Sequence, residues 1–182
     1  MADSVHVMTT EISQTSQLHT ERADLLAMLA KHRFFLRHTT RDLTDEQARA
    51  RTTVSELCLG GLIKHVARTE RSWTDFIQHG PATQEATPDA QAEFLDGFRL
   101  LPGETLAGVL AEYAEVAART DALVAALPDL GVAQPLPVAP WFPPGESWSA
   151  RRVLMHVVAE TAQHAGHADI IREALDGAKS MG

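Results

Sequence analysis

The sequence has little cysteine, little lysine and no long apolar run. Its single cysteine, Cys58, excludes an intramolecular disulfide and a metal site made of cysteines alone. No stretch approaches the ~18 apolar residues of a membrane-spanning helix. The amino-terminus lacks the charged start and apolar run of a signal peptide. We therefore expect a cytoplasmic protein that does not insert into a membrane.

Basic residues are also scarce, with 16 Lys and Arg against 24 Asp and Glu and a formal net charge of −8. Binding to phosphates requires a basic face, so this balance argues against a nucleic-acid partner. A length of 182 residues corresponds to one domain, which is large enough to bury a core without disulfides. We expect a single domain over residues 1–182. Residues 1–16 are polar and aperiodic, which predicts a loose tail or an extension of the first helical turn.

Sustained alternation of apolar and polar residues is absent, so no sheet is predicted. Apolar residues instead recur every three or four positions, which predicts long helices over residues 18–40, 57–78, 104–127 and 149–176. Thr44 and Gln47 fit a capping box and favour a short helix over 45–51. The predicted fold class is all-α: a four-helix bundle with a short extra helix and a long proline-rich connection, 128–148, before the last helix.

Two polar residues interrupt the apolar stripe of the last predicted helix. Glu160 and His164 are four residues apart, so about 6 Å of helix rise separates them and their side chains share a face. A carboxylate on a core face is costly unless it is paired or bound to a metal. His65 falls on the inner side of the stripe of the second long helix. Together they would form a site with open positions for water or substrate, as in catalytic zinc sites.

The spacing alone leaves other interpretations open. Glu160 and His164 also fit an exposed ion pair on a helix, and His156, four residues before Glu160, fits such a pair as well. His167 fits an additional ligand, a hydrogen-bond partner of a ligand, or a surface residue. The remaining histidines have no partnered spacing and are expected to be structural or surface residues: His6, His19, His32, His38 and His79.

Two further expectations concern packing. Gly60 and Gly61, near the start of the second long helix, are poor helix formers and predict a close approach of another segment. The proline-rich connection carries three large aromatic side chains that would otherwise form an exposed apolar patch. We expect them to lie against the bundle near the mouth of the site: Trp141, Phe142 and Trp148.

Three segments of the chain carry motifs of a known family. They are Asp42–Ala48, Leu59–Val66 continuing through Glu70–Trp73, and Ser149–Ile170 continuing through Arg172, Glu173, Asp176 and Gly177. In these motifs the sequence resembles the DinB-like superfamily, in the branch of unknown function called the mini-circle type. The resemblance covers most of the chain outside residues 81–128.

The resemblance implies a four-helix bundle with a divalent metal in its middle. Thiol-dependent maleylpyruvate isomerases and mycothiol S-transferases, which are related to this branch, have a ligand set of His, Glu and His. The matching positions here are His65, Glu160 and His164. His167 stands where other branches carry glutamine, which leaves its role open.

The function implied by the resemblance is that of a metal-dependent thiol transferase or isomerase. The implied cofactors are a divalent metal, zinc with nickel as the alternative, and a low-molecular-weight thiol that attacks a small electrophile. The chain has 13 Arg against 3 Lys, a bias typical of GC-rich genomes such as those of actinobacteria, whose thiol is mycothiol. Two alternative functions remain open: a metal-dependent hydrolase and a non-catalytic metal-binding stress-response protein. A homodimer is a further possibility for the assembly of the chain.

Overall fold

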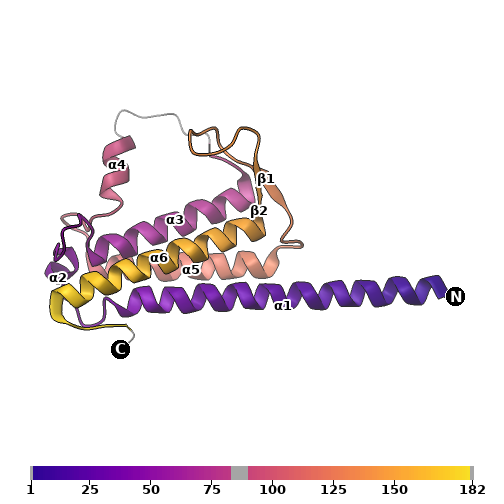
Figure 1. Ribbon diagram of the computed structural model, residues 1–182, viewed down its shortest axis with the longest axis horizontal. Coiled ribbons are helices and arrows are strands. Elements are labelled where there is room, and N and C mark those ends of the chain that lie inside the picture. The colour runs from indigo at the N-terminus through magenta and orange to yellow at the C-terminus, as the bar shows by residue number, and fades with distance from the viewer. Residues whose placement is uncertain (1, 83–89, 181–182) are drawn as a thin grey trace.

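Four long helices form the body of the protein, at the positions that the apolar spacing predicts. The computed structural model describes the backbone of residues 2–82 and 90–180, and the side chains of 18–82 and 92–180. The four helices are α1 (Ala2–His38), α3 (Leu59–His79), α5 (Leu106–Ala126) and α6 (Ala150–Asp176). Both α5 and α6 pack against α1 and α3, so α1 and α3 lie diagonally across the bundle from each other (Figure 1). The all-α four-helix bundle is confirmed.

Local capping interactions define the ends of the helices, and one of them, the capping box, is predicted by the sequence. Thr44 and Gln47 form the capping box that begins α2 (Asp45–Arg49). The hydroxyl of Ser149 accepts a hydrogen bond from the Arg152 N–H at the start of α6, and Gly177 ends this helix with a left-handed backbone at φ 79°. Among the described residues, no helix combines the length and the apolar character needed to cross a membrane.

Of the two interpretations of residues 1–16, the loose tail is wrong for the backbone and the helical extension agrees with it, because α1 begins at Ala2. The amino-terminal part of this helix projects beyond the rest of the bundle (Figure 1). No proline or glycine occurs before the end of α1. Once a helix has formed, each further residue adds one backbone hydrogen bond, so α1 can extend beyond the part that packs on the bundle. This extension carries no apolar stripe that would predict it from the sequence.

The prediction of no sheet is also wrong, although only slightly. Strands β1 (Ala133–Pro135) and β2 (Ser147–Ser149) pair antiparallel, with Ala133 opposite Ser149. Three-residue strands are too short to show an alternating pattern. Beside this pair, the Ala150 and Arg151 N–H groups donate to the carbonyls of Val132 and Leu130, at 2.8 and 2.9 Å. The connection therefore satisfies N–H groups that would otherwise be free at the start of α6.

The segment between α3 and α5 contains the short helix α4 (Ala90–Asp96), outside the helices that the apolar spacing predicts. Residues 83–89 of this segment lie outside the described part of the chain. After α4 the chain runs back over the beginning of α3, where Phe98 and Leu100 reach the two glycines Gly60 and Gly61.

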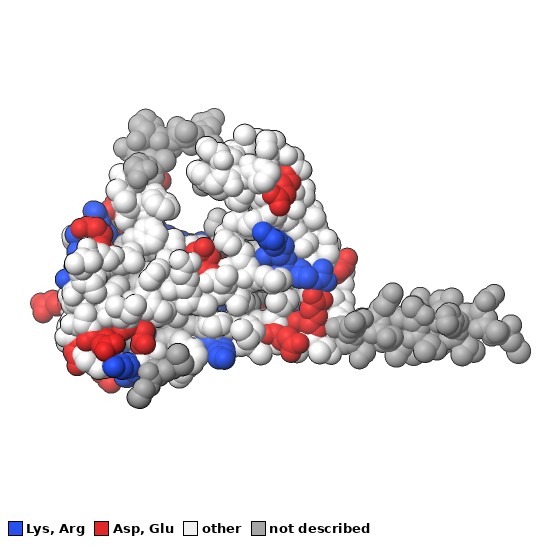
Figure 2. All heavy atoms as spheres, in the orientation of Figure 1, with Lys and Arg blue, Asp and Glu red and all other residues white. Residues whose placement is uncertain are grey.

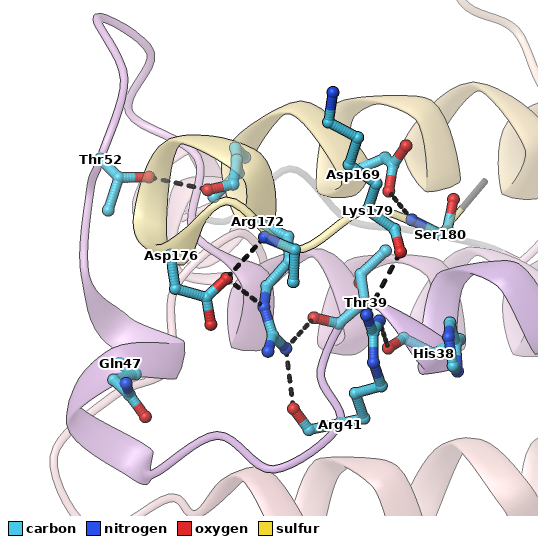
Figure 3. A network of polar contacts seen from close by, with 12 residues as sticks. His38, Thr39, Arg41, Gln47, Thr52, Asp169, Arg172, Asp176, Lys179 and Ser180 are labelled. Atoms are coloured by element: carbon cyan, nitrogen blue, oxygen red, sulfur yellow. Dashed lines mark hydrogen bonds and ion pairs between the residues drawn. The ribbon is translucent and has the colours of Figure 1, made fainter. Parts of the chain in front are cut away.

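A buried arginine ties the end of α6 to the loop between α1 and α2 (Figure 3). The Arg172 guanidinium donates to the carbonyls of Thr39 and Arg41, at 2.8 and 2.7 Å, and to Asp176 Oδ1 at 2.8 Å. Arg172 is only 5% exposed. The loop carbonyls therefore depend on this one side chain for their hydrogen bonds.

Candidate metal centre

The three predicted ligands lie at the edge of the bundle core. On α6 the buried positions are Ala150, Val153, Leu154, Val157, Thr161, Ala165, Ala168, Ile171 and Arg172. Glu160 and His164 flank this stripe, with side chains 28% and 12% exposed. Both therefore lie on the predicted face at its solvent edge, and His65 is likewise half-buried on α3. A position at the edge leaves the group open to solvent on one side.

The structure brings these three side chains together from two helices. One ligand atom from each of His65, Glu160 and His164 lies within 4.8 Å of the others. Within the described part of the chain, no other set of three such residues meets this condition. The imidazoles of His65 and His164 meet edge to face, with ring centroids 4.8 Å apart. His164 Nε2 lies 3.6 Å from Glu160 Oε2.

The imidazole of His65 is held on two sides. The ring of Phe98 stacks on it, with centroids 3.9 Å apart and an interplanar angle of 20°. Thr69 Oγ1, one turn further along α3, lies 3.5 Å from His65 Nε2. Burial lowers the pKa of His65 to about 4, and the nearby charges of His164 and Arg68 act in the same direction. The imidazole is therefore neutral at pH 7, the form that binds a metal.

Phe98 reaches His65 because Gly61 has no side chain. A methyl group at Gly61 would overlap the carbonyl oxygen of Phe98. The predicted close approach at Gly60 and Gly61 is thus confirmed, and its partner is the segment that follows α4. Sequence reasoning missed Phe98 itself, although the two glycines were a signal that something packs there.

His167 and His156 each contact one of the predicted ligands. His167 Nδ1 lies 3.3 Å from His164 Nδ1, so that one ring can donate to the other. His156 Nε2 lies 3.9 Å from Glu160 Oε1. Burial lowers the pKa of His164; the Glu160 carboxylate opposes this shift and the charge of His167 adds to it. Burial also lowers the pKa of His156. The charge of Glu160 opposes this shift, and the charge of Arg152 adds to it.

Aromatic side chains extend from His156 along the outer edge of the site. Trp148 stacks on Trp73 with ring centroids 4.9 Å apart, and His156 packs edge-on against both. The Arg152 guanidinium lies 4.8 Å from the centre of the Trp148 ring. The prediction that the connection packs near the site holds for Trp148 and for the half-buried Phe142, which contacts it. It is wrong for Trp141, which is 76% exposed.

The other histidines of the described side chains lie elsewhere, as expected. His19 and His79 are exposed, and His32 and His38 are half-buried on α1. The side chain of His6 lies outside the described residues. Cys58 is buried at the N-cap position of α3, with its sulfur 3.9 Å from the Phe98 carbonyl oxygen.

The donor set fits a divalent metal. Two neutral imidazoles and one carboxylate, converging from two helices of a bundle, match the ligands that hold catalytic zinc and leave coordination positions for water or substrate. The open side of the group gives a small molecule access to those positions. The fold and this group define a helical-bundle protein with a candidate metal centre between α3 and α6.

Comparison with known proteins gives the family. A family model described as mycothiol-S-transferase matches residues 24–177. The chain belongs to the mycothiol S-transferase family, in agreement with the DinB-like resemblance of its motifs. No curated protein matches the sequence.

Among solved structures, the chain is similar to a conserved protein from Enterococcus faecalis. The TM-score is 0.64 with 13% sequence identity, over 85% of this chain and 96% of that one. A similarity at this level of identity concerns the fold alone, and it supports the bundle described above.

Proposed function

We propose that the protein is a metal-dependent thiol S-transferase or isomerase. In this proposal His65, Glu160 and His164 bind one divalent metal, zinc or alternatively nickel. The second cofactor is a low-molecular-weight thiol, mycothiol, which attacks a small electrophile. The observation that carries the proposal is the convergence of the three ligand atoms within 4.8 Å in a member of the mycothiol S-transferase family.

The chemistry requires a thiol that reacts as its thiolate. A free thiol has a pKa of about 8.5, and a metal bound at this site would lower that pKa far enough to deprotonate it. The protein's own Cys58 is buried under the segment that follows α4 and faces the Phe98 carbonyl. The reactive thiol must therefore be supplied from outside the chain.

The residues around the site keep the ligands in place. Thr69 and Phe98 fix the ring of His65, and His167 fixes the ring of His164. Oriented imidazoles bind a metal more tightly, and loss of such a supporting side chain commonly lowers affinity ~10–100-fold. His156, beside Glu160 and neutral at pH 7, is placed to accept the proton that a thiol releases.

Metal analysis and thiol consumption test this proposal together. Purified protein is expected to bind one divalent metal per chain and to consume mycothiol with at least one member of a panel of small electrophiles. His164→Ala is expected to abolish both, whereas His79→Ala, an exposed histidine at the end of α3, is expected to change neither. Protein that takes up no metal, or a His164→Ala variant that retains it, would contradict the proposed site.

The same measurements separate the alternative functions. A protein that binds metal and hydrolyses esters or amides without consuming thiol would be a metal-dependent hydrolase, because the metal would then activate water. A protein that binds metal without turnover would be a binding protein. The assignment to the mini-circle branch rests on the three motif segments together and belongs to this proposal.

A further inference from the structure

The outward face of α6 is made mostly of small and apolar residues, and all of them except the half-buried Ala162 are exposed to solvent. We call this the α6 face; it consists of Met155, Ala159, Ala162, Gln163, Gly166 and Ile170. Met155 and Ile170 are 57% and 63% exposed, which is unusual for side chains of this size on a packed helix. Figure 2, seen from the side where α6 lies in front of α5, shows a broad uncharged area over the middle of this helix.

Gly166, in the middle of the α6 face, has no function in the packing of the described chain. A Cβ atom added there would meet nothing within 4 Å. Glycine inside a helix is unfavourable relative to alanine, because it loses more backbone entropy on folding. At Gly61 this cost is compensated, because the missing side chain lets the segment around Phe98 pack against the helix. Gly166 lacks such a neighbour within the described chain, so its presence points to a helix outside it.

The α6 face also has the spacing of a helix–helix interface. Met155, Ala159, Ala162 and Gly166 follow one another at steps of four, three and four, the spacing that keeps a stripe facing a second helix. The pattern is symmetric about the midpoint between Ala162 and Gln163. Ala159 and Gly166 lie at equal distances on either side of that point, and so do Met155 and Ile170.

The symmetric pattern identifies the partner as a second copy of this chain. In an antiparallel pair of α6 helices, the small residues would meet at the centre, and each Met155 would meet the partner's Ile170. Symmetric interfaces of this kind are self-complementary by construction. A pattern that reads the same in both directions along the helix is complementary to an antiparallel copy of itself, whereas a helix of an unrelated protein would match it only by coincidence.

Charged residues at the two ends of the α6 face favour the antiparallel direction. Arg152 and Glu173 are both exposed and lie at equal distances from the same midpoint. Antiparallel packing would place each arginine opposite the partner's glutamate, in addition to the contact that Glu173 makes with Lys179 at 3.0 Å. Parallel packing would place like charges opposite each other, which is unfavourable. We propose that the protein forms a homodimer in which the α6 faces of two copies pack antiparallel.

The proposed interface borders the candidate metal centre without including it. Met155 and Ala159 directly precede His156 and Glu160 on the same helix, and Arg152 also packs on Trp148. A second copy on the α6 face would cover the back of the helix that supplies two of the proposed ligands. The dimer does not depend on the metal, so the two proposals fail independently.

Solution mass tests the proposal. By light scattering at about 100 μM protein, the wild-type chain is expected to have twice its monomer mass of 19.8 kDa. Gly166→Arg, which places a charge at the centre of the α6 face, is expected to be monomeric. Ala118→Arg, at an exposed position on α5, is expected to remain dimeric. A monomeric wild-type protein, or a dimer that survives Gly166→Arg, would overturn the proposal.

Charge reversal and cross-linking test the direction of packing without disturbing its centre. Glu173→Arg is expected to weaken dimerisation about tenfold, and the double variant Arg152→Glu/Glu173→Arg to restore it. Ala162→Cys, next to the midpoint, is expected to be cross-linked between chains by a short thiol reagent, whereas Ala118→Cys is not. If Glu173→Arg leaves the dimer unchanged and Ala162→Cys is not cross-linked, the antiparallel α6 interface is wrong even where a dimer exists.

Discussion

Arg33 on α1 binds Glu70 on α3 across the diagonal of the bundle. The guanidinium donates to both carboxylate oxygens, at 3.2 and 2.5 Å, and Glu70 is fully buried. Arg33 also reaches Asp121 on α5 at 2.8 Å, so one side chain links three of the four helices. Burial and the Glu70 charge raise the pKa of the neighbouring Tyr113 hydroxyl, which keeps that group neutral.

Removing one partner of this pair is expected to destabilise the protein strongly. Glu70→Ala leaves a guanidinium that is only 6% exposed without its main partner, and we expect a loss of about 3–5 kcal/mol in the free energy of unfolding. Arg33→Met/Glu70→Leu removes both charges and is expected to lie much closer to wild type, because apolar pairs often replace buried ion pairs at little cost. Urea denaturation measures both, and equal losses in the two variants would refute this account of the pair.

Gly61 is expected to tolerate no side chain. Gly61→Ala forces the Phe98 carbonyl away from α3, at a cost of about 1–3 kcal/mol for overpacking that exceeds the gain in helix propensity of about 1 kcal/mol. Because Phe98 then leaves His65, metal affinity is expected to fall as well. Gly60→Ala is the matched control. Its methyl group would meet Leu100 Cδ2 at 3.0 Å, which can rotate away, and would lie 3.3 Å from the Ala48 carbonyl oxygen and Leu100 Cβ, far less crowded than the overlap at Gly61. If thermal unfolding and metal titration give the same stability and the same metal affinity for the two variants, the approach of Phe98 to α3 does not depend on Gly61.

The loop between α1 and α2 is expected to depend on Arg172. Arg172→Met leaves the carbonyls of Thr39 and Arg41 without their donor, and we expect a loss of about 3 kcal/mol. Arg172→Lys retains the charge but has no planar fork to reach both carbonyls, so an intermediate loss is expected. Faster hydrogen exchange in residues 39–44 would locate the effect in the loop. An Arg172→Met variant as stable as wild type would mean that water replaces the guanidinium.

The helices could be predicted because each carries its own local signals. The capping box at Thr44 and Gln47 lies where the sequence places it, and Ser149 and Gly177 bound α6 at the ends of the predicted range 149–176. The amino-terminal part of α1 has no apolar stripe, and β1 and β2 are too short to show a period. These were missed because no pattern within the chain distinguishes them from loops.

The candidate site could be predicted only in part. The spacing of Glu160 and His164 shows that they share a face, but a helical wheel does not say where the core ends, since the buried stripe spans more than ~100°. Both residues lie on the predicted face but at its partly exposed edge. The stacking of Phe98 on His65 and the diagonal contact of Arg33 with Glu70 join segments that are distant in the sequence. Such contacts follow from the packing of the helices, which no local pattern reports.

A buried lysine gives the protein a sensitivity to acid. Lys64, only 3% exposed, lies 2.7 Å from Glu104, which also accepts a hydrogen bond from the Leu101 N–H at 2.8 Å. Burial by itself raises the pKa of Glu104, but the hydrogen bonds from Lys64 and Leu101 outweigh it, so the net pKa lies below its usual value of 4.5. A carboxyl group whose pKa is lowered by folding stabilises the folded state at higher pH. This stabilisation begins to fall near pH 4.5 and is lost as the pH drops through the lowered pKa.

Glu104→Gln is therefore expected to cost about 2 kcal/mol at pH 7 and progressively less as the pH falls below 4.5, where wild-type Glu104 is itself protonated. The cost lies below the range for fully buried pairs because a third of the Glu104 side chain, 32%, is exposed. Urea denaturation of both proteins at pH 7, 5 and 3 measures the difference. Glu112→Gln is the control, because its ion pair with Arg71 is exposed on both sides and screened by water. If the gap between Glu104→Gln and wild type stays constant from pH 7 to pH 3, the carboxylate of Glu104 does not stabilise the fold through its charge.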